Sequence, residues 1–194
     1  MAKLTRNDLY SLEKYAEIRA DFRAQVIAHK KNRRVPLGAR AALYFEDALT
    51  MQYQVQEMLR IERIFEARGI QDELDVYNPM IPDGGNWKAT FMLEYTDDGE
   101  RRAALAKLIG VEKAVWMRVA GFDPVYPICD EDLDRSSADK TASVHFLRFE
   151  LTPEMVAAVN NGAAISAGID HPNLQATLSP LPAPLRDALA ADLG

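Results

Sequence analysis

Residues 141–151 read TASVHFLRFEL, the most regular strand pattern in the chain. Successive side chains of a strand point to opposite faces, so His145, Leu147 and Phe149 share one face. The other face carries Val144, Phe146, Arg148 and Glu150. This alternation predicts a strand with one face turned toward a core.

Further strands are expected on both sides of this one. Strand-like segments lie at residues 41–45, 87–95, 114–120, 125–129, 163–169 and 174–178. Several of them are joined by connections too short for a parallel crossover, so we expect a mostly antiparallel sheet. An irregular edge strand or turn is expected at residues 35–38, where a proline and a glycine occur.

Helical periodicity dominates the first 77 residues. It predicts helices over residues 1–31 (divided near Asp21), 47–68 and 71–77, with Gly69 as a stop signal. Later helices are expected at residues 97–110, 152–162 and 185–193. The fold class predicted is α+β, with N-terminal helices packed on a mostly antiparallel sheet and a C-terminal helix.

Chain length favours one core. A chain of 194 residues buries about 70% of its unfolded surface. We assign residues 1–179 to a single α+β domain, helical over 1–77 and strand-rich over 86–179. Residues 180–194 are expected to form a C-terminal helix attached through a proline-rich link.

The net charge is −6, and it is unevenly distributed. Residues 1–70 hold 13 basic and 9 acidic side chains, whereas residues 71–194 hold 10 and 20. Such asymmetry is typical of a nucleic-acid-binding end, here Lys30 to Arg34, or of two faces or two protomers that attract each other. The basic excess is small beside the phosphate contacts of a nucleic-acid binder, so we favour attraction between two faces of one domain or between two protomers over nucleic-acid binding. A homo-oligomer is expected.

Several classes of protein are excluded by what the sequence lacks. No apolar stretch approaches the roughly 18 residues of a membrane span, so no membrane association is expected. The single Cys129 excludes an intramolecular disulfide framework and a thiolate-held cluster, and fits a reducing cytoplasm. The common nucleotide, metalloprotease and hydrolase motifs are absent, which leaves open whether the protein is an enzyme. The acidic loop 130–140 has Arg135 and Thr141 where a calcium loop needs Gly and Glu, and is interpreted as solvated.

A first candidate site would bind a small anion. Arg148 and Glu150 share a strand face, and a planar guanidinium suits a carboxylate or phosphate. Arg60, Arg63 and Lys88 are the other candidate ligand-binding residues. The competing interpretation is a simple ion pair on the surface of the strand.

A second candidate site would hold a metal. The candidate ligands are His145, His171, Glu57 and Glu62. Asp170 beside His171 is suited to orient an imidazole ligand. Against this, the position of His145 among apolar residues is typical of a hydrogen-bonded core histidine.

Long segments resemble a bacterial family known as domain of unknown function 3501. They are AHKKNRRV at 28–35, LYFED at 43–47, TMQYQVQEMLRIERI at 50–64, YNP at 77–79, NWKAT at 86–90, HFLRFEL at 145–151 and GIDHP at 168–172. The resemblance covers roughly residues 3–172. Genes of this family often lie beside those for a rubrerythrin and for a cysteine-rich iron–sulfur protein similar to heterodisulfide reductase subunits.

The resemblance therefore implies a cytoplasmic accessory protein of a redox or oxidative-stress system, with the rubrerythrin and the iron–sulfur protein as partners. No cofactor is assigned. The alternative is an enzyme or sensor that binds a small anion or a metal through its Arg, Glu and His side chains. The two hypotheses differ in a testable way, because the second requires the candidate residues to converge in one cleft.

Overall fold

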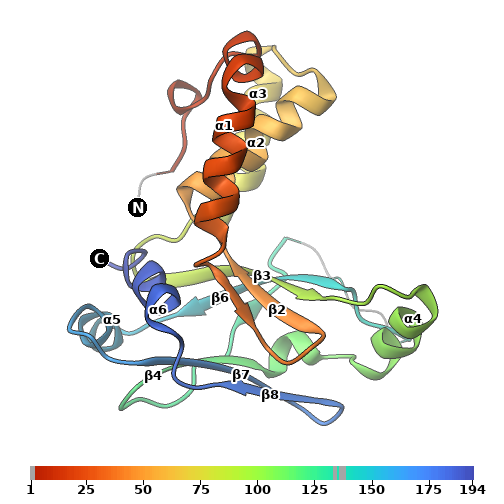
Figure 1. The fold of residues 1–194 in the computed structure, drawn as a ribbon, viewed down its shortest axis with the longest axis vertical. Helices are drawn as coiled ribbons and strands as arrows, with labels where there is room; N and C mark the ends of the chain where they lie inside the picture. Colours follow the sequence, from red (N-terminus) through yellow and green to blue (C-terminus); the bar gives the residue numbers. More distant parts are fainter. Residues whose placement is uncertain (1–2, 133–134, 136–138) are drawn as a thin grey trace.

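The computed structural model describes residues 3–132, 135 and 139–194. Within these residues the chain forms six α-helices and two antiparallel sheets, which confirms the α+β class. The arrangement has two parts (Figure 1): a body that contains both sheets, and three N-terminal helices that stand away from it.

The first sheet has the strand order β1-β2-β3-β6-β5. Its strands are β1 (Arg34–Pro36), β2 (Ala41–Phe45), β3 (Asn86–Leu93), β6 (Val144–Glu150) and β5 (Ile128–Cys129). The second sheet has the order β4-β7-β8, from β4 (Val115–Val119), β7 (Ile165–His171) and β8 (Leu174–Leu178). Every pairing is antiparallel, as the short connections predicted.

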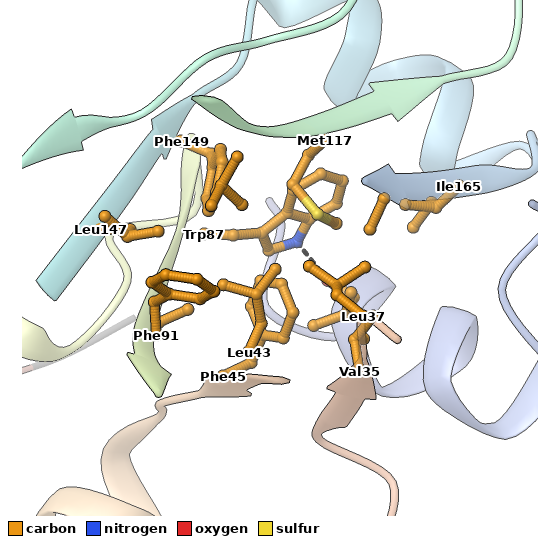
Figure 2. Close-up of a cluster of buried hydrophobic side chains, with 14 of the residues drawn as sticks. Val35, Leu37, Leu43, Phe45, Trp87, Phe91, Met117, Leu147, Phe149 and Ile165 are labelled. Atoms are coloured by element: carbon orange, nitrogen blue, oxygen red, sulfur yellow. Dashed lines mark hydrogen bonds between the residues drawn. The ribbon is translucent and has the colours of Figure 1, made fainter. Parts of the chain in front are cut away.

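The main core lies between the two sheets. Figure 2 shows side chains from both of them meeting around Trp87 and Met117, which are fully buried. The Trp87 indole N–H donates to the carbonyl of Leu189 over 2.9 Å. Burial of Leu185 and Leu189 from α6 (Ala183–Ala190) joins the C-terminal helix to the same core. The strand alternation seen in the sequence thus decides which face of each strand is buried.

The N-terminal helices form a separate bundle, which we call the helical arm. It consists of α1 (Leu12–Lys30), α2 (Ala48–Glu62) and α3 (Ala67–Tyr77), preceded by the short turn η1 (Arg6–Asp8) and followed by η2 (Asn78–Met80). The arm has two small cores of its own, one around Tyr15 and Phe22 and the other around Leu59 and Leu74. These side chains pack helix on helix. Figure 1 shows that the three helices stand away from the sheets.

The remaining helices belong to the body. They are α4 (Asp98–Lys107), the short η3 (Val111–Ala114) and α5 (Pro153–Asn160). Of the helices in the described part of the chain, none combines the length and the apolar character needed to span a bilayer.

Three expectations about the helices were wrong. Helix was expected from the start of the chain, but α1 begins at Leu12, and of residues 3–11 only Arg6–Asp8 form a short helical turn. α1 is continuous through Asp21, because residues 12–30 contain neither proline nor glycine to interrupt it. α2 ends at Arg63, whose φ of 56° is left-handed, rather than at Gly69. Gly69 lies inside α3, where a Cβ would come within 2.7 Å of Ile64. Its small size is therefore required for close packing, not for ending a helix.

Most strand boundaries also differ from those expected, by up to three residues, and two strands illustrate this. β7 begins at Ile165 and continues to His171, two residues beyond the predicted end. Of residues 125–129 only Ile128–Cys129 form a strand, although Val125 makes an isolated bridge to Met117. The ends of a strand depend on how far the neighbouring strand pairs with it. The alternation within one strand does not show where that pairing stops.

Candidate functional site

A pocket of about 560 Å³ lies where the helical arm meets the first sheet. Its floor is the outer face of β3 and β6, one wall is the end of α3 with η2, and the other is formed by Glu131, Asp132 and Arg135. A second pocket, of about 610 Å³, lies between residues 4–11 and the arm. Its only charged lining side chain is Arg6, so the first pocket holds the richer chemistry.

Lys88 and Arg148 lie side by side on the pocket floor. They are directly opposite each other in the β3–β6 register, so their side chains leave the sheet on the same face. The Lys88 ammonium donates to the carbonyl of Pro79 over 2.6 Å. Burial lowers the pKa of Lys88, the positive charge of Arg148 lowers it further, and the Asp83 carboxylate opposes both.

Arg148 is held by two carboxylates. Its Nε and Nη2 donate to Glu131 over 2.8 and 2.7 Å, and its Nη1 donates to Glu150. These hydrogen bonds lower the pKa of Glu131 and raise that of Arg148. The ion pair between Arg148 and Glu150, which was the competing interpretation, is present. Arg148 itself lines the pocket, so the anion site stays a prediction.

The other two candidates for the anion site are elsewhere. Arg60 lies in the last turn of α2 and donates to Glu57 over 3.2 Å. Arg63 ends that helix. The 15 residues of α2 rise about 22 Å away from the sheet where the helix begins. The structure therefore brings together Lys88, Arg148 and Glu150, and leaves the arm's arginines outside the pocket.

The four metal candidates are not brought together. His145 is fully buried, with Nδ1 2.6 Å from Asp130 and Nε2 2.9 Å from Thr141. Among residues 3–132, 135 and 139–194, no group of three His, Cys, Asp or Glu side chains is arranged to hold a metal. His145 is thus a buried histidine with hydrogen bonds to protein groups.

The remaining metal candidates have partners of their own. His171 accepts from the Asn173 N–H at Nδ1, so its Nε2 carries the proton and donates to Ile109 over 3.2 Å. Glu57 accepts from Tyr15 and from Arg19 on the helical arm. The arginine lowers the pKa of Glu57 to about 2. Glu62 is the last residue of α2 and is exposed.

A buried charge cluster at the root of the arm was missed by the sequence analysis. Arg33, only 3% exposed, donates to the carbonyls of Phe45 and Glu46 over 3.1 Å and also to the carboxylate of Asp192. A second carboxylate, Asp47, lies 3.4 Å from the guanidinium. Arg33 stands in the basic run considered for nucleic acid, and no local pattern distinguishes it from its exposed neighbours Lys31 and Asn32.

The beginning of the acidic loop also has a structural part that was not foreseen. Asp130, in a left-handed conformation with φ 49°, accepts from the backbone N–H of Phe146 over 2.9 Å and contacts His145. Arg135 lies over the Phe146 ring, 4.5 Å from its centroid. Much of the loop interpreted as solvated, residues 133–134 and 136–138, lies outside the described residues.

Cys129 is half-buried and packs against the main core. Its Sγ lies 3.5 Å from the carbonyl of Glu112. Burial raises the pKa of the Cys129 thiol to about 12, and the Glu112 carboxylate adds to the shift. The thiolate is the reactive form, so this sulfur is a poor nucleophile at neutral pH.

Comparison with known proteins yields a family and a solved relative. A family described as protein of unknown function (DUF3501) matches residues 3–193. The crystal structure of a novel protein of unknown function from Burkholderia pseudomallei K96243 is 49% identical and has a TM-score of 0.94. The alignment covers 100% of both chains. None of the curated proteins compared matches the chain.

Proposed function

Because the chain belongs to the DUF3501 family of proteins of unknown function, we propose a role consistent with its chemistry: a non-catalytic accessory protein of a redox or oxidative-stress system in the cytoplasm. Its partners are a rubrerythrin and a cysteine-rich iron–sulfur protein. The state of Cys129 supports an accessory role, because a thiol with a raised pKa does not exchange readily with disulfides.

The tip of the helical arm carries the proposal. Ile61 in the last turn of α2 and Phe65 in the connection to α3 are 60% and 65% exposed. Large apolar side chains exposed together on a projecting element are typical of a protein-binding surface. Figure 1 shows this tip at the end of the molecule farthest from the sheets, where a partner meets no obstruction from the body.

A pull-down from the native bacterium tests the accessory role. Wild-type protein is expected to recover both the rubrerythrin and the iron–sulfur protein. The double variant Ile61→Glu, Phe65→Glu should recover at least about tenfold less of each partner, because a charge at an apolar contact is strongly unfavourable. Tyr126→Glu, at a residue 52% exposed on the body, is the matched control and should recover both partners. Recovery of neither partner by the wild type would contradict the proposal.

We further propose that the protein is a homodimer. The support is the charge asymmetry, since the first 70 residues have a basic excess and the remainder an acidic one. Sedimentation equilibrium should give twice the mass of one chain at low salt. The dimer is expected to dissociate in 1 M salt, because charges more than about 3 Å apart are then largely screened from each other. A single-chain mass at low salt and high protein concentration would refute the dimer.

A second candidate function is the binding of a small anion. The observation that favours it is Lys88, a half-buried ammonium that forms no ion pair with any residue in the described part of the chain. Two of its three N–H donors remain for a ligand. Loss of anion binding in a Lys88→Met variant tests this candidate.

A further inference from the structure

The pocket at the foot of the arm is built to accept one negative charge rather than two. Arg148 is already neutralised by Glu131 and Glu150, and Arg135 pairs with Asp132 over 2.6 Å. Lys88 forms no hydrogen bond or salt bridge with a carboxylate among the described residues, although Asp83, Glu131 and Glu150 are near enough for their charges to act on it. Glu131 and Asp132 also line the pocket and repel a second negative charge.

The rest of the lining is largely apolar. Val76 on α3 is 64% exposed, and Met80 and Phe146 are each half-buried. Val76 therefore adds exposed apolar surface to this wall of the pocket, and contact with a hydrocarbon body would remove that surface from water. A volume of about 560 Å³ is in the range of pockets that enclose small organic molecules.

These features give the pocket two ends of different character. The Lys88 ammonium, on the strand floor, is fixed by its hydrogen bond to the Pro79 carbonyl. The apolar surface is contributed by the arm on one side and by Phe146 on the other. A phosphate dianion would use the ammonium but none of the apolar surface, and it would face the carboxylates of the wall. A neutral hydrocarbon would leave the ammonium without a counter-ion.

We propose that this pocket binds an amphipathic monocarboxylate, with the carboxylate on Lys88 and the hydrocarbon body against Val76, Met80 and Phe146. The inference rests on the anion-binding function proposed above and specifies the class of ligand. The carboxylate accepts the free N–H donors of Lys88, and the apolar body removes exposed hydrocarbon of both molecules from water.

Isothermal titration calorimetry with decanoate tests the ligand class. Wild-type protein should bind decanoate in one site, and decanol should bind about tenfold more weakly or not at all, because it lacks the charge. Lys88→Met, which keeps the stem and removes the ammonium, should weaken decanoate binding about tenfold or more. Lys107→Met removes an exposed lysine on α4 and should leave the affinity unchanged.

A second variant tests the apolar end independently of Lys88. Val76→Asp changes an exposed side chain, so folding should be preserved, and the added carboxylate should weaken decanoate binding about tenfold. Circular dichroism verifies that each variant is folded. Equal binding of decanoate and decanol, or no effect of Lys88→Met, would overturn the proposal.

Titration with inorganic phosphate distinguishes anion binding in general from binding of a monocarboxylate. If phosphate binds, depends on Lys88, and decanoate does not bind, the anion site stands and the monocarboxylate inference is overturned. If neither ligand binds, both are overturned. The accessory role tested by the pull-down is unaffected by either result, because it rests on the tip of the arm.

Discussion

Replacing Arg33 by methionine is expected to lower the free energy of unfolding by about 3–5 kcal/mol. The guanidinium connects the root of the arm to the C-terminal segment through Asp192, and both side chains are almost fully buried. Removal of the cation leaves Asp192 as a buried carboxylate without its partner, and the carbonyls of Phe45 and Glu46 without a donor. Urea denaturation measures the loss.

The penalty should depend on pH in a defined direction. Burial raises the pKa of Asp192 to about 6 even beside Arg33, and loss of the cation raises it further. An aspartate has a pKa near 3.9 in the unfolded chain. When its pKa is higher in the folded protein, it contributes most to the free energy of unfolding below pH 3.9. That contribution is lost as the pH rises through the pKa of the folded protein. The Arg33→Met penalty should therefore be about 1 kcal/mol or more larger at pH 7 than at pH 5.

A matched control separates burial from charge alone. Arg23→Met, at an exposed position in the middle of α1, should change the free energy of unfolding by no more than about 0.5 kcal/mol. An Arg33→Met variant as stable as this control, or one whose penalty is the same at both pH values, would show that the cluster does not hold the arm to the body.

Replacing Trp87 by alanine is expected to lower the free energy of unfolding by about 3–5 kcal/mol. The indole fills the centre of the core between the sheets and is fully buried (Figure 2). Its loss leaves a cavity, and it also removes the hydrogen bond to the carbonyl of Leu189. Trp87→Phe keeps most of the volume and should lose about 1–2 kcal/mol, since mainly the hydrogen bond is removed.

Hydrogen exchange and denaturation together test this second prediction. Trp87→Ala should speed amide exchange in α6, because the indole holds that helix through Leu189. Tyr126→Ala, at a residue 52% exposed, should change the free energy of unfolding by no more than about 0.5 kcal/mol. A Trp87→Ala loss below about 1 kcal/mol, or unchanged exchange in α6, would place the centre of the core elsewhere.

The strand faces were predictable because they depend only on alternation. The expected division of residues 144–150 between His145, Leu147 and Phe149 on the buried face and Arg148 on the other is present in β6. Element type was also predictable for the long periodic helices. The helix ends were not, because Arg63 rather than a glycine takes the left-handed conformation that ends α2.

The candidate site was predictable in part. Lys88 and Arg148 were singled out for their chemistry, but their pairing across β3 and β6 depends on register, which joins residues 60 positions apart. Arg60 and Arg63 have the same chemistry and lie outside the pocket because α2 directs them away from the sheet. The residue types thus indicated which side chains could bind an anion. The positions of the helices and strands determined which of those side chains lie in the pocket.

The sequence by itself determined the α+β class, the buried faces of the strands, the membership of the family and the absence of thiol pairs. These features follow from local periodicity, composition and residue identity, all of which are present in the unfolded chain. Only the tertiary structure decided that the helices form a projecting arm, that Arg33 is buried against Asp192, and that Lys88 faces a pocket without forming a salt bridge among the described residues. Each of these depends on contacts between distant segments, whose free energies arise only when the chain is folded.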